Sequence, residues 1–394
     1  MTTILRLKRR EDRRIRAGHL WIFSNEIDTA ATPLKGLEAG APVRIESADG
    51  RFLAHAYANP ASLISARVTS RDARQPFDGT LLRARLGHAL TLRQRRYDEP
   101  FYRWVHGEGD FLPGLVVDRY DDALVVQLTT AGMECRRTEI VEMLAELSGA
   151  GSIALVNDTS VRVLEGLPSY RQQVHGSARD ELKVRENDLD FTVPATVAQK
   201  TGWFYDHRDS RALLRNWVKD ARVLELYCYL GAFGINALAG GAKEVVAIDA
   251  SIQAVEAARV NAVSNGVETR FEARQDDAVE AMRALVEQGE RFDVVVLDPP
   301  AFVKRRKDLD AGTRHYTLNN KLAMKLLAPG GILLSASCSQ AVDPMAFERL
   351  LGNALPKTAT GLQLLHPLRQ AADHPVNAAM AETLYLKGSI CRPV

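Results

Sequence analysis

The second half of the chain alternates apolar runs with amphipathic segments, and this pattern restricts the fold more than any other feature. Strands are predicted at ARVLELYCYL, EVVAIDAS, FDVVVLDPP and ILLSASCS. The almost continuously apolar FDVVVLDPP is typical of a strand buried on both faces. Intervening helices are predicted at SIQAVEAARVNAVSNG, with Ser251 as N-cap, and at TLNNKLAMKLLAPGG, which Pro329 is expected to stop. Residues 185–394 should therefore form a doubly wound, mostly parallel sheet.

Two regions of different texture precede this one. Residues 1–72 contain short, partly alternating runs with a hairpin turn predicted at residues 48–50, which indicates a small β-rich domain. Residues 73–184 mix predicted helices, such as GTLLRARLGHALTLRQRRY, with strands, which indicates a small α/β domain. A chain of 394 residues is expected to hold two or three domains of roughly 100–200 residues each.

Composition argues against several classes of protein. The formal net charge is only +2, so a nucleic-acid surface would have to come from local clusters of charge. The four cysteines are scattered without CxxC spacing, which argues against a zinc site and is typical of a reducing compartment. No signal peptide and no run of roughly 20 apolar residues is apparent. We expect a cytoplasmic protein without a membrane partner or metal; the oligomeric state, a homodimer included, stays open.

In doubly wound sheets, ligands bind outside the carboxyl ends of the strands. The first such end carries Gly231 and Gly234, whose small size lets a cofactor approach the backbone. This turn lacks the GxGxxG of dinucleotide enzymes, which argues against an NAD-dependent oxidoreductase. Asp249 follows the second strand, where a carboxylate typically accepts hydrogen bonds from ribose hydroxyls; capping of the next helix is the alternative.

Two further strand ends carry aspartates, and the end of another strand carries a cysteine. Asp276 or Asp277 is placed to meet an adenine edge, although helix capping would explain either aspartate equally well. Asp298 is followed by two prolines that stiffen the turn, so its carboxylate can be aimed at a nucleobase amino group. Cys338 ends the next strand, which should neighbour the strand of Asp298. Core packing is the default for each of the four cysteines, but this placement favours a nucleophile.

Basic residues gather at two places. The N-terminal segment combines arginines with aromatic residues, as nucleic-acid surfaces do, although a solvated charged face with core aromatics is the simpler interpretation. A basic run also follows the Asp-Pro-Pro turn, where it could bind phosphates or form a solvated loop. The candidate RNA-binding residues are Arg9, Arg10, Arg13, Trp21, Lys304, Arg305 and Arg306.

Stretches along nearly the whole chain resemble one family. They are GHLWIFSNEI, GEGDFLPGLVVDRY, QKTGWFYDHRDSR, VLELYCYLGAFGINALAGGAKEVVAID, DVVVLDPPAFVK and LLSASCS. The catalytic region resembles class I S-adenosylmethionine-dependent methyltransferases. The whole chain resembles the ribosomal large-subunit methyltransferase I family, which makes 5-methylcytosine in 23S ribosomal RNA. His207 and Tyr205 depart from the family pattern, in which glutamine and leucine are common.

The resemblance implies an architecture and a set of site residues. Residues 1–72 would be an RNA-binding PUA domain, residues 73–184 a small α/β domain, and residues 185–394 a Rossmann-like methyltransferase domain. S-adenosylmethionine is the implied cofactor and 23S ribosomal RNA the implied partner. The implied cofactor-binding residues are Lys200, Phe204, Asp206, Arg208, Glu225, Tyr227, Gly231, Phe233, Asp249, Asp277, Asp298 and Pro299.

The implied reaction gives Cys338 and Asp298 catalytic roles. A thiolate that adds to carbon 6 of cytosine makes carbon 5 nucleophilic toward a methyl sulfonium. Asp298 would bind the exocyclic amine and the protonated ring edge. Two alternatives stay open: methylation of a purine nitrogen, which an acidic-Pro-Pro turn also serves without a cysteine, and a non-catalytic RNA-binding or assembly protein. The base that removes the carbon-5 proton is not identified.

Overall fold

The computed structural model describes residues 3–394 and divides into two compact units. The first unit comprises Met1–Leu182, Ala198–Trp203 and Ala372–Thr383. The second comprises Lys183–Val197, Phe204–Ala371 and Leu384–Val394. The predicted domain boundaries after residues 72 and 184 stay predictions, because the two units do not correspond one to one to the three predicted domains.

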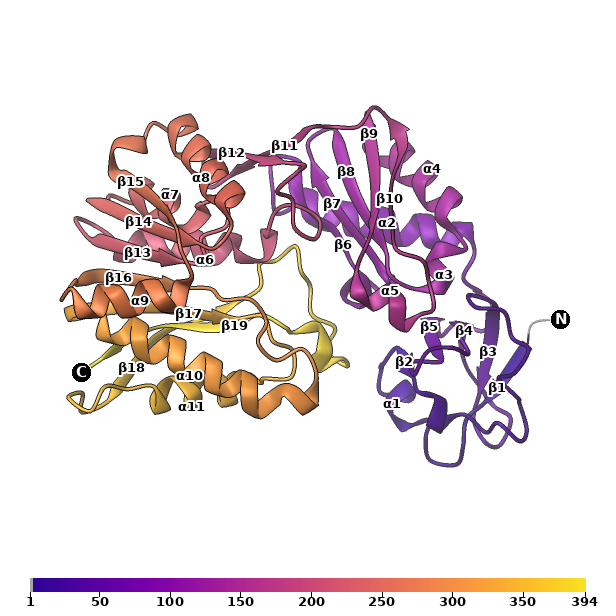
Figure 1. The fold of residues 1–394 in the computed structure, drawn as a ribbon. Helices are drawn as coiled ribbons and strands as arrows, with labels where there is room; N and C mark the ends of the chain where they lie inside the picture. Colours follow the sequence, from indigo (N-terminus) through magenta and orange to yellow (C-terminus); the bar gives the residue numbers. More distant parts are fainter. Residues whose placement is uncertain (1–2) are drawn as a thin grey trace. The chain divides into compact units, whose positions relative to one another are not determined.

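The first unit contains a small N-terminal sheet of order β1-β3-β4-β5-β2 (Figure 1). Its strands are β1 (Thr3–Arg6), β2 (Trp21–Ile22), β3 (Pro42–Glu46), β4 (Phe52–Ala58) and β5 (Ala66–Ser70), with α1 at Arg13–Arg16. The hairpin turn between β3 and β4 is confirmed, and Gly50 adopts φ +79° there, which glycine accepts without steric cost. Aliphatic side chains such as Leu5 and Ile45 form a core of this sheet's own.

A second sheet of order β10-β9-β8-β7-β6 completes the first unit. Its strands are β6 (Phe101–His106), β7 (Leu115–Tyr120), β8 (Ala123–Leu128), β9 (Ser152–Asn157) and β10 (Tyr170–Gly176). The helices are α2 (Gly79–Gln94), α3 (Ala131–Glu134), α4 (Arg137–Ser148) and α5 (Ser160–Leu164). Only β8 and β9 pair in parallel in this sheet, and α2 and α4 cover its apolar face. The predicted mixture of helices and strands is confirmed.

The second unit is built around a seven-stranded sheet of order β15-β14-β13-β16-β17-β19-β18 (Figure 1). The strands are β13 (Arg222–Leu226), β14 (Glu244–Asp249), β15 (Phe271–Gln275), β16 (Phe292–Leu297), β17 (Leu327–Ser337), β18 (Leu362–Arg369) and β19 (Lys387–Pro393). The first five run parallel, and β19 runs antiparallel to both of its neighbours. The expected doubly wound α/β fold is confirmed.

Helices cover both faces of this sheet. They are α6 (Arg208–Leu214), α7 (Ala232–Ala239), α8 (Ile252–Ser264), α9 (Ala278–Glu287), α10 (Leu309–Lys325) and α11 (Pro344–Asn353). The last three share a core with β13, β14, β16 and β17, whereas α7 and α8 pack on the other face, where α8 also contacts the hairpin β11 (Glu181–Glu186)–β12 (Leu189–Pro194). Ser251 caps α8 as predicted. The predicted stop at Pro329 is wrong, since α10 ends at Lys325 and Pro329 lies within β17.

Residues 3–394 contain neither a helix that could cross a membrane nor a cluster of side chains that could hold a metal ion. No helix in this range combines the length and the apolar character that crossing a membrane requires. The same residues contain no group of three or more His, Cys, Asp or Glu side chains that could hold a metal ion.

A buried carboxylate holds the segment that enters the second unit. Glu186, at the end of β11, accepts hydrogen bonds from Arg211 to both of its oxygens, at 2.5 and 2.9 Å. Arg208 lies 3.4 Å from one of the same oxygens. Arg211 also donates to the Phe204 carbonyl at 2.8 Å, so this cluster fixes residues 204–211 against the hairpin. Glu186 and both arginines are buried, and a buried ion network is strongly destabilised when one partner is removed.

We therefore expect Glu186→Gln to lower the free energy of unfolding of the second unit by about 3 kcal/mol, because it removes the buried negative charge that Arg208 and Arg211 both contact. Glu256→Gln, on the exposed face of α8, is the matched control and should change it by less than about 0.5 kcal/mol. Urea denaturation followed by circular dichroism measures both. Equal effects of the two substitutions would contradict a supporting role for Glu186.

Candidate active site

The strand order places a switch point between β13 and β16. From β13 the sheet grows through β14 and β15 in one direction, and through β16 and β17 in the other. The carboxyl ends of these five parallel strands meet at one edge, because neighbouring strands pair in register. Ligands of doubly wound sheets bind in the crevice outside such a point. The predicted residues at the strand ends therefore share one edge of the sheet.

The turn after β13 is bent by unusual backbone conformations. Tyr227 and Tyr229 have φ values of +61° and +48°, and Gly231 has +75°. Residues other than glycine rarely adopt this region, and such strain gathers at functional sites. Tyr227 is held by a 2.7 Å hydrogen bond that its hydroxyl donates to Asn319 of α10. Burial raises the pKa of Tyr227 well above its ordinary value, so the hydroxyl stays a donor.

Glu225, the last but one residue of β13, binds the start of α7. Its carboxyl group accepts the backbone N–H groups of Phe233 at 3.1 Å and Gly234 at 2.9 Å. Burial raises the pKa of Glu225 to about 8, against the lowering effect of these two hydrogen bonds. A Cβ at Gly234 would lie 2.6 Å from a Glu225 oxygen, so glycine is required for this approach. The side chain of Glu225 thus fixes the first helix of the site.

Asp249, at the end of β14, ties two of the strand-end turns together. One oxygen accepts the N–H of Tyr229 and the other accepts that of Ser251, each at 2.9 Å. Ser251 itself caps α8, so Asp249 is not the N-cap. A carboxylate has about four acceptor positions, and Asp249 is half-buried. Its remaining lone pairs fit the ribose hydroxyls of a nucleoside cofactor.

Asp277 caps a helix, as its alternative interpretation held. One of its oxygens accepts the N–H groups of Val279 at 2.9 Å and Glu280 at 3.1 Å at the start of α9. Asp276 accepts the N–H of Asp277 at 2.8 Å. A contact of Asp277 with an adenine edge stays a prediction.

Asp298, after β16, pairs with a histidine from outside the sheet. His207 Nε2 lies 3.2 Å from an Asp298 oxygen, and His207 is buried whereas Asp298 keeps partial exposure. Burial alone lowers the pKa of His207, but the charges of Asp298 and then Asp206 outweigh it and raise this pKa above its ordinary value. The nearby Asp298 carboxylate thus favours the protonated form of His207, and the contact between the two side chains orients the Asp298 carboxylate.

Cys338 follows directly on β17, and its strand neighbours that of Asp298, as predicted. The residue is partly buried. Its neighbour Ser339 accepts the N–H of Val303 at 3.0 Å and shares a 2.8 Å hydrogen bond with the Tyr316 hydroxyl. The loop that begins at Asp298 is thus tied to the segment that carries Cys338. The thiol of Cys338 and the carboxylate of Asp298 follow two strands, β17 and β16, that are hydrogen-bonded to each other.

The other three cysteines differ in their surroundings. Cys228 and Cys391 are buried, and burial raises the pKa of both thiols, that of Cys391 to about 12. Core packing is confirmed for these two, and Cys391 lies in β19. For Cys135 the default of core packing is wrong, because this residue is exposed just after α3. Its thiol donates a hydrogen bond to the Ala39 carbonyl at 3.5 Å.

The residues from Lys200 to Arg208 that the family resemblance implies to bind the cofactor belong partly to the first unit and partly to the second. Lys200 lies in the first unit, where neighbouring Thr201 accepts a hydrogen bond from Tyr120. In the second unit Phe204 packs edge-on against the ring of Tyr229, with centroids 5.3 Å apart. Asp206 accepts a 2.6 Å hydrogen bond from Tyr385, and Arg208 belongs to the Glu186 cluster. The ring of Phe233 packs against that of His207, with centroids 5.4 Å apart. Pro299 is buried, and its contact with the cofactor stays a prediction.

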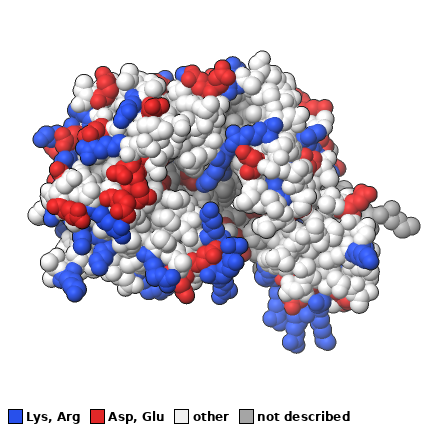
Figure 2. Space-filling model, viewed as in Figure 1, with Lys and Arg blue, Asp and Glu red and all other residues white. Residues whose placement is uncertain are grey.

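The two basic groups are exposed. Figure 2 shows Lys and Arg side chains gathered at the lower end of the N-terminal part, where α1 lies. Arg9, Arg10 and Arg13 are exposed, as are residues 304–306. Trp21 differs, because it is half-buried and its indole N–H donates to Glu108 at 2.8 Å. Glu108, which lies between β6 and β7, is thus a structural partner of Trp21.

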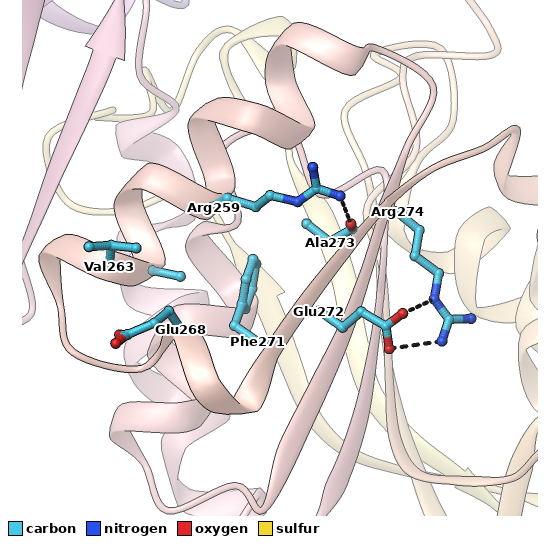
Figure 3. A pocket seen from close by; sticks show the side chains of 8 residues that line it. Arg259, Val263, Glu268, Phe271, Glu272, Ala273 and Arg274 are labelled. Atoms are coloured by element: carbon cyan, nitrogen blue, oxygen red, sulfur yellow. Dashed lines mark hydrogen bonds and ion pairs between the residues drawn. The ribbon is translucent and has the colours of Figure 1, made fainter.

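A separate hollow of about 450 Å³ lies between α8 and β15 (Figure 3). It is lined by Arg259, Ala262, Val263, Glu268, Phe271, Glu272, Ala273 and Arg274. None of the predicted site residues lines it. It follows the outer side of the edge strand, away from the strand ends.

Comparison with known proteins adds family relationships to this geometry. Residues 5–71 match a model described as a PUA-like domain. Residues 103–385 match the model of S-adenosylmethionine-dependent methyltransferases. "Ribosomal RNA large subunit methyltransferase I" of Tolumonas auensis is 37% identical over the full length of both chains. That of Klebsiella pneumoniae is 36% identical over 95% of this chain and 94% of its own. The chain belongs to the ribosomal RNA large subunit methyltransferase I family.

Solved structures agree on the fold of the family member. A SAM-dependent methyltransferase from Streptococcus mutans superimposes with a TM-score of 0.85 at 18% identity, over the whole of both chains. A methyltransferase structure complexed with SAH gives a TM-score of 0.84, also at 18% identity and over both full lengths. The family model that matches residues 103–385 gives S-adenosylmethionine as the cofactor, in agreement with the half-buried acceptor Asp249 beside the glycine turn.

Several residues of the site escaped the sequence analysis. His207 was noted only as a departure from the family pattern, and Asn319, Tyr316 and Lys387 were not selected. Each comes from an element that does not end at the sheet edge, so no strand-end argument reaches it. The buried polar residues within the apolar patterns of α10 and β19 are the one signal that could have drawn attention to them.

The pKa of His207 gives a testable pH dependence. Because the folded state raises this pKa above the unfolded value, the stabilisation is fully present below about pH 6.5 and is lost as pH rises through the folded pKa. The difference in unfolding free energy between wild type and His207→Gln should therefore shrink from pH 6 to pH 9. A folded pKa that lies tenfold in proton affinity above the unfolded one corresponds to a change of about 1.4 kcal/mol. Urea titrations at several pH values measure it, with exposed His88→Gln as the control. A difference that stays constant with pH would refute the ion pair.

Proposed function

We propose that the protein methylates carbon 5 of a cytosine in ribosomal RNA of the large subunit, with Cys338 as the nucleophile. The observation that carries the proposal is the pairing of β16 with β17, after which the carboxylate of Asp298 and the thiol of Cys338 follow on adjacent strand ends beside the switch point. The names of the curated relatives supply the substrate class. The 23S molecule and the carbon-5 position come from the family resemblance.

Each residue has a defined task in this reaction. Attack of the Cys338 sulfur on carbon 6 forms a C–S bond and moves electron density to carbon 5. Asp298, oriented by His207, accepts hydrogen bonds from the exocyclic amine and the protonated ring edge, so it stabilises the ring as charge develops. S-adenosylmethionine, when bound, supplies the methyl group that carbon 5 attacks. Removal of the carbon-5 proton by a base then lets the C–S bond break and frees the thiolate.

Other residues would hold the cofactor and the RNA. Asp249 would accept the ribose hydroxyls, and the turn of Tyr227, Tyr229 and Gly231 would lie along the cofactor. The exposed loop of Lys304, Arg305 and Arg306 begins at the turn of Asp298, so it is placed to contact the phosphates beside the target nucleotide. The target base must leave its stack to reach the thiol, which favours a flipped or single-stranded cytosine.

The nucleophile is tested by substitution. Cys338→Ala should lower methyl transfer to ribosomal RNA at least about a thousandfold, because the covalent step is lost. Cys135→Ser, which changes the exposed thiol of α3, should leave the rate unchanged. Full activity of Cys338→Ala would favour methylation of a purine nitrogen, and absence of S-adenosylmethionine binding by the wild type would favour a non-catalytic protein.

Two further measurements address the product. RNA that contains 5-fluorocytosine should form a denaturation-resistant adduct with the wild type and none with Cys338→Ala, because fluorine at carbon 5 prevents the elimination that frees the thiolate. Bisulfite sequencing of ribosomal RNA from cells with and without the gene should show one cytosine that changes status. No change at any cytosine would overturn the substrate assignment.

The exposed arginines of the N-terminal domain predict salt-dependent RNA binding. Arg9→Gln/Arg10→Gln should weaken RNA binding and reduce the slope of log affinity against log salt by roughly one to two, because two phosphate contacts are lost. Arg349→Gln/Lys357→Gln removes the same charge from exposed positions of the second unit and should leave the slope unchanged. Filter binding at several salt concentrations measures both, and equal slopes for the two double variants would exclude a specific RNA surface around α1.

A further inference from the structure

A buried lysine contacts the segment that carries Cys338 on both sides of this residue. Lys387 is the first residue of β19, and the antiparallel register pairs it with Ser337, which immediately precedes Cys338. Its ammonium group donates a hydrogen bond to the carbonyl of Ser339, which immediately follows Cys338. One lysine is thus joined to both chain neighbours of the thiol, by its backbone on one side and by its side chain on the other.

This lysine is buried without a carboxylate in ion-pair contact. Lys387 is 3% exposed, and among residues 3–394 no carboxylate oxygen lies within 4.0 Å of its ammonium group. A buried ammonium is costly unless a negative charge accompanies it. Burial lowers the pKa of Lys387 to about 8, whereas negative charges on Cys338 and then Asp343 raise it. The lysine and the cysteine therefore interact electrostatically, and such an interaction acts equally on both partners.

Other ionisable groups face the thiol from neighbouring elements. From α10, Tyr316 lies beside Ser339, and the charge of Cys338 contributes to raising the pKa of Tyr316, for which burial is the largest cause. Asp343 caps α11 and accepts the N–H of Ala346 at 2.8 Å. On the side of β16, Asp298 is compensated by His207. Lys387 is a basic group among them whose pKa the charge of Cys338 raises.

We propose that Lys387 is a positioning residue whose ammonium group stabilises the thiolate of Cys338. The proposal rests on Cys338 being the nucleophile, and it names the group that makes this thiol reactive at neutral pH. An ordinary thiol has a pKa of about 8.5 and is a thiolate only to a few per cent at pH 7. Beside the lysine, the thiol releases its proton to water and keeps the electron pair on sulfur, which then forms the bond to carbon 6.

The pH dependence of Cys338 alkylation tests this without RNA. The full-length protein carries Cys135→Ser to remove the exposed thiol, and the iodoacetamide reaction of the Cys338 peptide is followed by mass spectrometry between pH 6 and 10. The wild-type midpoint should lie below about 8.5. Lys387→Met should move the midpoint about one pH unit higher, and Lys387→Arg, which keeps the charge, should leave it near the wild-type value. The rate at pH 7 should fall about three- to tenfold in Lys387→Met, since higher intrinsic nucleophilicity offsets part of the lost thiolate.

Two outcomes would overturn the proposal. One is a Lys387→Met profile that superimposes on the wild type; the other is a wild-type midpoint above about 9, which does not depend on any variant folding. Binding of S-adenosylmethionine shows whether Lys387→Met has kept the fold, and Lys387→Gln replaces it where it has not. The two proposals fail in different experiments. Full methylation activity in Cys338→Ala would refute Cys338 as the nucleophile, whereas the alkylation midpoints would still show whether Lys387 stabilises the thiolate.

Discussion

The parallel pairing of β13 with β14 on one side and β16 on the other is the constraint on which the site depends. Leu226 pairs with Ile248 in one direction and with Leu297 in the other, so three carboxyl ends lie level at one edge. The buried aliphatic side chains of these strands pack against helices on both faces. A slip in register would move whole rows of them out of contact, so the core that stabilises the fold also fixes the positions of Asp249 and Asp298.

Acidic side chains of the second unit are held by two kinds of partner, backbone N–H groups and basic side chains. Glu225 and Asp249 accept backbone N–H groups of the turns beside them, which orients the turns and needs no second charge. Asp298 is paired with His207, and Glu186 with two arginines. The acidic side chains that shape the backbone are thus satisfied by peptide dipoles, whereas the one proposed to contact the nucleobase is paired with a titratable side chain.

Sequence reasoning reached the features that local pattern determines. The strands end where the apolar runs end, Ser251 caps α8, and Cys338 lies on the strand beside that of Asp298, because periodicity and parallel order fix these without tertiary detail. It failed where contacts join distant segments. His207 approaches Asp298 across 91 residues of chain (298 − 207), and Lys387 reaches the thiol only because β19 reverses direction beside β17. Local sequence does not show which distant segment either side chain approaches.

Two basic side chains take part in the proposed reaction: Lys387 acts near the sulfur of Cys338, and His207 acts beside Asp298. As the sulfur of Cys338 bonds to carbon 6, negative charge leaves the neighbourhood of Lys387 and moves onto the ring, toward the group that Asp298 and His207 hold. A charged lysine lowers the energy of the thiolate and therefore also makes it less willing to react, so its stabilisation must be modest. Burial provides this restraint, because it disfavours the ammonium form and lowers the pKa of Lys387 to about 8. Water would screen the charge of a fully solvated lysine, and a carboxylate partner would compensate the charge of a paired one.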